Sequence, residues 1–436
     1  MNTKQFAMIQ TVLILAVITL IFLATACNTN QSPIPVEIRE ENGRFELYRD
    51  GKPYFIKGVG GWGHLDLLVS IGGNSVRTWG TGERTMALLD KAHEKGLSVC
   101  LGLDMQRERH GFDYNDEQAV AQQLERMRAE VLKYKDHPAV LMWGVGNELG
   151  LNYTNPQVWN AVNDVSKMIH DLDPHHPTTT MTAGVVEERM QEIKQRCTDL
   201  DLLAVNAYGS LARLTEDVRK TGWEKAYIVT EWGPTGHWAA PRTEWDVAIE
   251  ETSTEKRKAY YKHYQQAIAS DTSRCLGSYA FLWGQKQERT HTWYGMFMEN
   301  GDPLEVIDAM QRNWTGEWPE HRSPSIDSVR LDGQQAIDDI SVQPGEPVEA
   351  VVYSHAADSQ SVQIEWEIYH ESTDLKSGGD REGKPAKVEN RFEQNHTVQA
   401  RFKAPQQPGP YRIFVYIKDP DINRTATANI PFYVNQ

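Results

Sequence analysis

The chain has 436 residues, 40% of them hydrophobic and 24% charged, which is a globular composition with room for more than one domain. Its formal net charge is −15, so clustered phosphate contacts are disfavoured and nucleic acid is not an expected partner. The same charge disfavours anionic polysaccharides, unless a local basic cleft reverses it where a substrate binds.

The N-terminus carries a targeting signal. An apolar run over residues 6–26 ends in small residues directly before Cys27. This order resembles a bacterial lipobox, which implies cleavage before Cys27, a lipid on its thiol and a place in the cell envelope, on the periplasmic face or the cell surface. We therefore predict a lipoprotein signal peptide over 1–26 and a polar tether over 27–43. A transmembrane anchor is the alternative, because the run is long enough to span a bilayer.

From residue 44 to residue 321, apolar β-prone runs alternate with amphipathic stretches. A hairpin turning at Asp50–Gly51 comes first, and helices are expected over about 85–95 and 116–134. The predicted strands lie at 55–59, 75–79, 97–103, 140–145, 178–182, 202–208, 226–230 and 278–283. Strands that alternate with helices form a parallel sheet, and eight of them favour a closed (β/α)8 TIM barrel.

Helical periodicity disappears over residues 322–436. Alternating runs such as Val348–Tyr353 and Tyr411–Tyr416 are separated by turn residues there. The pattern predicts a small β-sandwich of immunoglobulin-like type, with a loose loop at Ser377–Asp380. Its Trp, Trp366, is expected in the core of that sandwich, which favours a spacer or packing role over carbohydrate binding.

Two glutamates follow the predicted strands four and seven. Glu148 ends the run Gly-Asn-Glu, and Glu231 lies in the run Thr-Glu-Trp. Catalytic groups of a TIM barrel sit at these strand ends. Glycosidic bond cleavage needs one carboxyl kept protonated and one kept ionised. Arg77, at the end of strand two, is placed to hold one carboxylate ionised, and Tyr208, after strand six, to donate to the nucleophile.

These residues, with Phe55–Gly58, Asn147 and Trp283, resemble the clan A glycoside hydrolases. The closest resemblance is to the TIM-barrel catalytic domain of glycoside hydrolase family 2, with some likeness to the β-1,3-glucanosyltransferases of fungal walls. It covers the barrel and implies that Glu148 is the acid/base and Glu231 the nucleophile of a retaining double displacement. By the same resemblance, Arg77 orients Glu231, Asn147 contacts the 2-hydroxyl, and Trp283 forms the floor of the donor subsite.

The chain departs from the clan at Asn206. Many members have a His two residues before the Tyr of strand six, so the usual hydrogen-bond partner of the acid/base is replaced. Family 2 enzymes also normally carry β-sandwich domains before the barrel, whereas the sandwich predicted here follows it. Further substrate-binding candidates lie at strand ends or in the loops after them: Asn206, Tyr208, Trp232, Trp79, Trp62, Asp104 and His237.

We predict a retaining β-glycoside hydrolase that acts on β-linked glucan or oligosaccharide without a cofactor or metal. A β-glucan transglycosylase with the same two glutamates is one alternative, and a non-catalytic glycan-binding surface lipoprotein is another. The expected partners are a β-linked saccharide and, through the N-terminal lipid, a membrane. The sequence leaves the oligomeric state open, as well as whether Cys197 and Cys275 pair.

Overall fold

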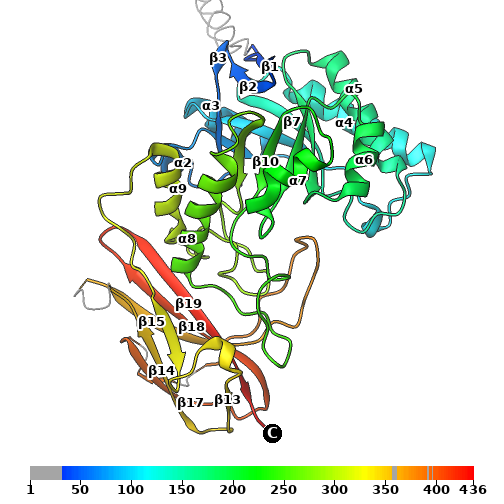
Figure 1. Cartoon of the computed structure of the whole chain (residues 1–436). Helices are drawn as coiled ribbons and strands as arrows, with labels where there is room; N and C mark the ends of the chain where they lie inside the picture. Colours follow the sequence, from blue (N-terminus) through cyan, green and yellow to red (C-terminus); the bar gives the residue numbers. More distant parts are fainter. Residues whose placement is uncertain (1–31, 356–360, 390–391, 395) are drawn as a thin grey trace, which may run out of the picture.

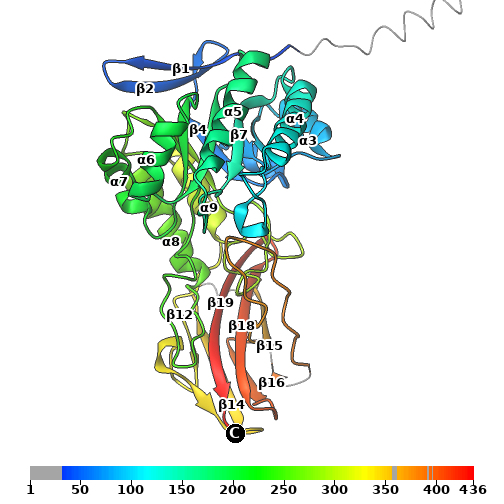
Figure 2. The same cartoon turned by 90° about the vertical axis from the view of Figure 1, so that its right-hand side faces the viewer.

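The structure is a computed structural model that describes residues 32–355, 361–389, 392–394 and 396–436 (Figure 1). A parallel barrel fills one half of the molecule, and two packed sheets fill the other (Figure 2). The predicted signal peptide 1–26 and Cys27 lie outside the described residues, so the lipid anchor stays a prediction. None of the described helices is both long and apolar enough to cross a membrane.

The barrel is closed, with its parallel strands in the order β10-β11-β4-β5-β6-β7-β8-β9. The strands are β4 (Ile56–Gly60), β5 (Ser75–Arg77), β6 (Ser98–Leu103), β7 (Val140–Asn147), β8 (Thr178–Ala183), β9 (Leu202–Asn206), β10 (Tyr227–Glu231) and β11 (Cys275–Ala280). β7 is buried up to Gly146, because a parallel strand is covered on both faces. The predicted (β/α)8 barrel is confirmed, with its eighth strand starting earlier than expected.

Helices surround the barrel strands (Figure 1). They are α2 (Leu65–Ser70), α3 (Thr85–Glu94), α4 (Glu117–Tyr134), α5 (Gln157–Leu172), α6 (Glu187–Arg196), α7 (Leu214–Lys220), α8 (Ser253–His263) and α9 (Val306–Thr315), with short turns η1 (Glu108–His110), η2 (Leu211–Arg213) and η3 (Tyr264–Ile268). Asp116 caps the N-terminus of α4, because its carboxylate accepts a hydrogen bond from the N–H of Ala119 at 3.0 Å. α8 starts with a capping box between Thr252 and Glu255.

A short antiparallel sheet covers the end of the barrel that faces away from the sandwich (Figure 2). Its strands are β1 (Val36–Glu41), β2 (Arg44–Arg49) and β3 (Lys52–Pro53), and the predicted turn at Asp50–Gly51 joins the last two. Val36 and Leu47 are buried against side chains of the barrel strands. Residues 36–41 of the predicted tether 27–43 are therefore folded, because their backbone pairs with β2 and Val36 packs on the barrel.

The C-terminal part is a sandwich of two four-stranded sheets. One sheet contains β12 (Ser328–Leu331), β14 (Pro347–Tyr353), β17 (Gln399–Lys403) and β16 (Phe392–Gln394); the other contains β13 (Ser341–Val342), β19 (Arg424–Val434), β18 (Gly409–Asp419) and β15 (Gln363–His370), and η4 (Ala336–Asp338) lies between β12 and β13. Trp366 is buried between the sheets, as predicted. The predicted β-sandwich is confirmed.

Buried polar contacts join the sandwich to the barrel. Arg412 of β18 donates to the carbonyl of Ala248 at 2.8 Å and pairs with Glu371 at 3.0 Å. Asn429 of β19 donates to Glu250 at 2.7 Å. Because these groups are buried, each needs its partner, and together they fix how the sandwich sits on the barrel.

The cysteines within the described residues are all buried and free: Cys100, Cys197 and Cys275. The pairing of Cys197 with Cys275 that the sequence left open is therefore absent. Burial raises the pKa of each thiol to about 12, so these groups stay neutral and pack as small apolar side chains.

Candidate active site

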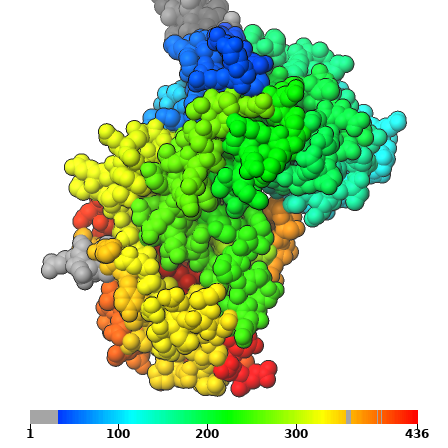
Figure 3. Space-filling view, in the orientation of Figure 1, coloured from blue at the N-terminus to red at the C-terminus, as the bar shows by residue number. Residues whose placement is uncertain are grey.

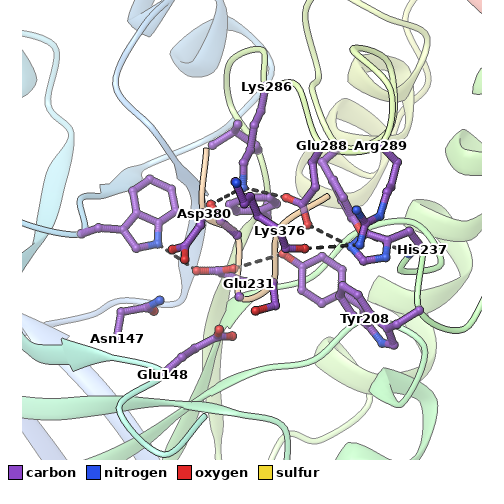
Figure 4. A pocket seen from close by; sticks show the side chains of 18 of the residues that line it. Asn147, Glu148, Tyr208, Glu231, His237, Lys286, Glu288, Arg289, Lys376 and Asp380 are labelled. Atoms are coloured by element: carbon purple, nitrogen blue, oxygen red, sulfur yellow. Dashed lines mark hydrogen bonds and ion pairs between the residues drawn. The ribbon is translucent and has the colours of Figure 1, made fainter. Parts of the chain in front are cut away.

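A cleft of about 490 Å³ opens at the C-terminal ends of the barrel strands, next to the sandwich (Figure 4). Six of the predicted site residues line it: Trp79, Asn147, Glu148, Tyr208, Glu231 and His237. They come from loops and strands far apart in the sequence. The barrel thus gathers them at the end where catalytic groups of this fold sit.

Glu231 ends β10 and accepts hydrogen bonds from three side chains. Arg77 donates to Oε1 at 2.9 Å, and the indole N–H of Trp79 donates to the same oxygen at 2.8 Å. The hydroxyl of Tyr208 donates to Oε2 at 3.1 Å. Arg77 is fully buried, so little water screens its charge from the carboxylate. These bonds hold the carboxylate in one orientation and stabilise negative charge on it.

Glu148 follows β7 and is held by Asn206. The amide nitrogen of Asn206 donates to Oε1 of Glu148 at 2.9 Å. The amide oxygen of Asn206 accepts from the hydroxyl of Thr230 at 2.8 Å, which fixes which way the amide faces. Where many clan members have a His, this chain therefore uses Asn206 as the hydrogen-bond partner of the predicted acid/base.

Glu148 holds its proton to a higher pH than an ordinary glutamate does. Burial, and then the negative charge of Glu231, raise the pKa of Glu148 to about 7, against the opposing effect of the hydrogen bond from Asn206. One carboxyl is thus placed to give a proton while the other is surrounded by donors. This separation of two acids in one cleft is the arrangement that glycosidic bond cleavage requires.

The backbone at Glu148 is left-handed, with a φ of 52°. Its N–H donates to the carbonyl of Met181 at 2.9 Å, and its carbonyl accepts from the N–H of Leu151 at 3.0 Å. This conformation costs a non-glycine residue on the order of 1 kcal/mol or more, and it persists only where the surrounding structure holds it. The turn directs the carboxyl into the cleft (Figure 4).

Asn147 connects the two carboxyl groups. Its side-chain oxygen accepts from Arg77 at 2.5 Å and from Asn206 at 3.3 Å. Arg77 also binds Glu231, and Asn206 also binds Glu148, so one network reaches both acids. Because the oxygen of Asn147 is engaged twice, its amide N–H groups are what it presents to a sugar hydroxyl.

Trp283 does not line the cleft. It is buried, its indole N–H donates to the carbonyl of Gly63 at 2.6 Å, and its ring packs edge-on against Phe297. The aromatic residue after β11 that lines the cleft is Phe281. The predicted place of Trp283 as the floor of the donor subsite is therefore corrected, since the chain turns after β11 and buries this ring.

Other predicted residues also lie outside the cleft lining. Trp232 is buried against Tyr260 of α8, so it belongs to the core. Trp62 is 42% exposed and lines a neighbouring cavity that shares Trp79 with the cleft. Asp104 faces solvent and pairs at 3.3 Å with Arg107, which does line the cleft.

His237 lines the cleft, but its ring lies against a carboxylate of the barrel. Its Nε2 lies 3.3 Å from Glu288, and both side chains are largely buried. The adjacent Trp238 is 60% exposed at the cleft, with its ring edge-on to Tyr208. Trp238 is therefore the residue after β10 that offers an open aromatic face to a sugar.

Sequence reasoning missed the basic side chains of the cleft. They are Arg107, Arg109, Lys286, Arg289 and Lys376. The first two follow β6, the next two follow β11, and Lys376 comes from the sandwich. The cluster Lys286–Arg289 directly after the last strand was a readable signal, since loops after barrel strands form the active site. Lys376 gave no such signal, because it lies in another domain.

Within the part of the chain that the structure describes, no group of three or more His, Cys, Asp or Glu side chains is arranged to hold a metal ion. The cleft offers an acid pair, hydrogen-bond donors, aromatic faces and positive charge. Carboxyl groups in such a place are suited to proton transfer and to nucleophilic attack on a polar substrate.

A model of the glycosyl hydrolases family 2 TIM barrel domain matches residues 81–308. The β-glucuronidase of Streptococcus agalactiae serotype V is 27% identical over 329 residues, which cover 64% of this chain and 52% of that protein. The chain thus spans about half the length of this relative.

Solved structures with the same fold include two β-glucuronidases. That of an uncultured Clostridium sp. has a TM-score of 0.52 at 18% identity, over 65% of this chain and 54% of that one. That of Dictyoglomus thermophilum has a TM-score of 0.51 at 20% identity, over 66% of this chain and 55% of that one. At these identities the likeness shows the fold.

Proposed function

The chain belongs to glycosyl hydrolase family 2, and from this premise we propose that it is a retaining β-glycosidase that removes β-linked hexuronic acid residues. Glu148 is the acid/base and Glu231 the nucleophile. The observation that carries the proposal is that the two acids lie in different environments. The pKa of Glu148 is raised to about 7, whereas Glu231 accepts hydrogen bonds from Arg77, Trp79 and Tyr208.

The same geometry lets Glu148 change role between the two steps. In the first step Glu231 attacks the anomeric carbon, and Glu148 gives its proton to the leaving oxygen. The resulting ester removes the negative charge of Glu231, which is the second cause of the raised pKa of Glu148. The pKa of Glu148 then falls, so its carboxylate can take a proton from water in the second step.

Positive charge in the cleft supports an acidic sugar. Among the described residues that line it, five are Arg or Lys, and apart from the catalytic pair two are carboxylates, Glu288 and Asp380. The cleft lining is thus locally positive although the chain has a net charge of −15. Such a local basic cleft is the condition under which the acidic composition allows an anionic substrate. Arg109 is the least compensated of these cations, since its nearest carboxylate is Asp380 at 3.7 Å. The relatives described as β-glucuronidases support the same class of sugar.

The other predicted functions receive less support. The similar proteins described above are β-glucuronidases, which favours neither a β-glucan substrate nor glucanosyl transfer. The intact network around Glu148 and Glu231 weighs against a binding protein without catalysis.

The roles of the two acids are tested with Glu148→Ala and Glu231→Ala. We expect losses of about 10² to 10⁴-fold for removal of the acid/base, and at least as much for the nucleophile. Azide should rescue Glu231→Ala to an α-glycosyl azide and Glu148→Ala to a β-glycosyl azide, because only the second passes through the glycosyl-enzyme. Turnover near wild type in either variant would overturn the assignment.

The sugar is tested by comparing 4-nitrophenyl β-D-glucuronide with the β-D-glucoside. A hydrogen bond to a charged group contributes about 1.5–3 kcal/mol, so the glucuronide should be favoured roughly 10- to 150-fold in kcat/KM. Arg109→Met should reduce this preference, and Arg126→Met, at an exposed position of α4, is the matched control. Equal or better cleavage of the glucoside would refute the acidic sugar.

We also propose that Cys27 carries the lipid that anchors the chain to the bacterial envelope. The support is the order of the N-terminal sequence, with small residues between a long apolar run and Cys27. Metabolic labelling with a palmitate analogue should mark the wild type and not Cys27→Ser. Equal labelling of both would refute the site.

A further inference from the structure

The C-terminal sandwich supplies one wall of the cleft. After β15 the chain leaves the sandwich and returns to it through residues that reach the barrel. Five consecutive residues of this connection, Lys376–Asp380, line the cleft, and we call them the sandwich loop. In the space-filling view this orange part of the chain lies directly beneath the barrel (Figure 3). Lys376 and Asp380 lie among barrel side chains near Glu231 (Figure 4).

The sandwich loop binds two cations of the barrel through its backbone. The carbonyl of Gly378 accepts from Arg109 at 3.3 Å, and the carbonyl of Gly379 accepts from Lys286 at 2.7 Å. Arg109 follows β6 and Lys286 follows β11, so the loop connects barrel loops after the third and the eighth strand. The positions of both cations therefore depend on a segment of another domain.

A buried carboxylate holds the sandwich loop in place. Glu382 is 3% exposed and accepts from the backbone N–H of Arg289 at 2.6 Å and from its guanidinium at 3.0 Å. The same carboxylate accepts from the backbone N–H of Lys376 at 3.0 Å. Glu382 thus ties the start of the sandwich loop to the barrel loop after β11. Loss of either partner would leave a buried charge uncompensated.

Two glycines allow the loop to approach the cations. Gly378 has a φ of 61°, and a Cβ there would lie 2.8 Å from the guanidinium of Arg109. Gly379 has a φ of 74°, and a Cβ there would lie 3.1 Å from Nζ of Lys286. Both φ values are left-handed, where side chains are rarely tolerated. A methyl group at either position would therefore move the cation or the loop.

We infer that the sandwich loop is a specificity-determining part of the catalytic unit, which positions Arg109 and Lys286 to bind the acidic group of the substrate. The charge of that group rests on the proposed function, whereas the place of the loop in the cleft does not. The sandwich is then more than the spacer or packing domain that the sequence suggested, because the cleft is incomplete without it.

The test uses Gly378→Ala and Gly379→Ala in the full chain, with Gly383→Ala as the matched control. Gly383 lies further along the same connection, and a Cβ there would meet its nearest neighbour, Asp374, at an ordinary 3.5 Å. KM and kcat are measured with 4-nitrophenyl β-D-glucuronide and with the glucoside.

We expect KM for the glucuronide to rise at least about fivefold in both cleft variants, with kcat and the glucoside KM nearly unchanged. Gly383→Ala should match the wild type. Cleft variants that are folded and either match Gly383→Ala or lose both substrates equally would overturn the inference. A general loss of folding would lower kcat for both substrates and leave the preference intact.

Two further arms keep the outcome clear. If Gly378→Ala does not fold, the isosteric Asp380→Asn replaces it. KM for the glucuronide should then fall, because Arg109 loses an anion that competes with the substrate. An unchanged or higher KM would count against the loop. If the wild type prefers the glucoside, the proposed sugar is wrong, and the loop is judged by the glucoside KM in the same variants. Unchanged glucoside kinetics would then refute the loop as well.

Discussion

Replacing Asn206 with Ala tests what sets the proton affinity of Glu148. The amide of Asn206 donates to Glu148 at 2.9 Å and lowers its pKa, whereas burial and the charge of Glu231 raise that pKa to about 7. A hydrogen bond to a charged group contributes about 1.5–3 kcal/mol, and about 1.4 kcal/mol corresponds to one pH unit. The pKa of Glu148 should therefore rise by about one to two pH units in Asn206→Ala.

The assay is the pH dependence of kcat/KM for phenyl β-D-glucuronide, whose poor leaving group needs the proton. Its alkaline limb reports the acid of the free enzyme. We expect this limb near pH 7 in the wild type and about one to two pH units higher in Asn206→Ala. Thr230→Val removes the bond that orients the amide but keeps the amide itself, so it should move the limb in the same direction by less than Asn206→Ala does. A limb that stays or moves toward acid in Asn206→Ala would refute the reasoning.

Three further substitutions follow from the same contacts. Folding raises the pKa of Glu148 from 4.5 to about 7, so the stability of the wild type falls as pH rises through this range. In denaturant unfolding, Glu148→Gln should therefore be up to about 3 kcal/mol more stable than the wild type at pH 8 but not at pH 4. An equal difference at both pH values would contradict this. Tyr208→Phe removes the donor to Oε2 of Glu231, so kcat/KM should fall roughly 10- to 150-fold with the fold retained, and a loss under threefold would count against this role. Trp283→Phe should lower the free energy of unfolding by about 1–3 kcal/mol, because the carbonyl of Gly63 loses its donor. The ratio of kcat/KM for the glucuronide to that for the glucoside should stay constant. A changed ratio would mean that Trp283 contacts the sugar after all.

The barrel could be predicted because its signals are local. Apolar runs such as Val140–Val145 are buried on both faces, and amphipathic stretches such as 117–134 form helices between the strands. The same regularity placed Glu148 and Glu231 at strand ends, where the structure finds them in one cleft. Arg77 and Tyr208 were found by the same logic, since each lies at or just after the end of a barrel strand.

The aromatic residue after β11 shows where local signals end. Phe281 and Trp283 lie two positions apart in the predicted strand 278–283, and the sequence pointed to Trp283 as the sugar contact. Only the path of the chain after β11 decides that Phe281 lines the cleft and that Trp283 is buried. Asn206 could be located on its strand, but its bond to Glu148 depends on how β7 and β9 lie on either side of β8.

The sequence by itself determined the two-part architecture, the acid pair and its chemical class, because periodicity and strand ends are encoded by neighbouring residues. The tertiary structure alone decided the proton affinity of Glu148, which depends on burial and on a charge that lies far away in the sequence. It also decided the charge of the cleft, where Lys376–Asp380 of the sandwich meet Arg109 and Lys286 of the barrel. Such contacts carry no local pattern, because they join segments that become neighbours only when both domains have folded.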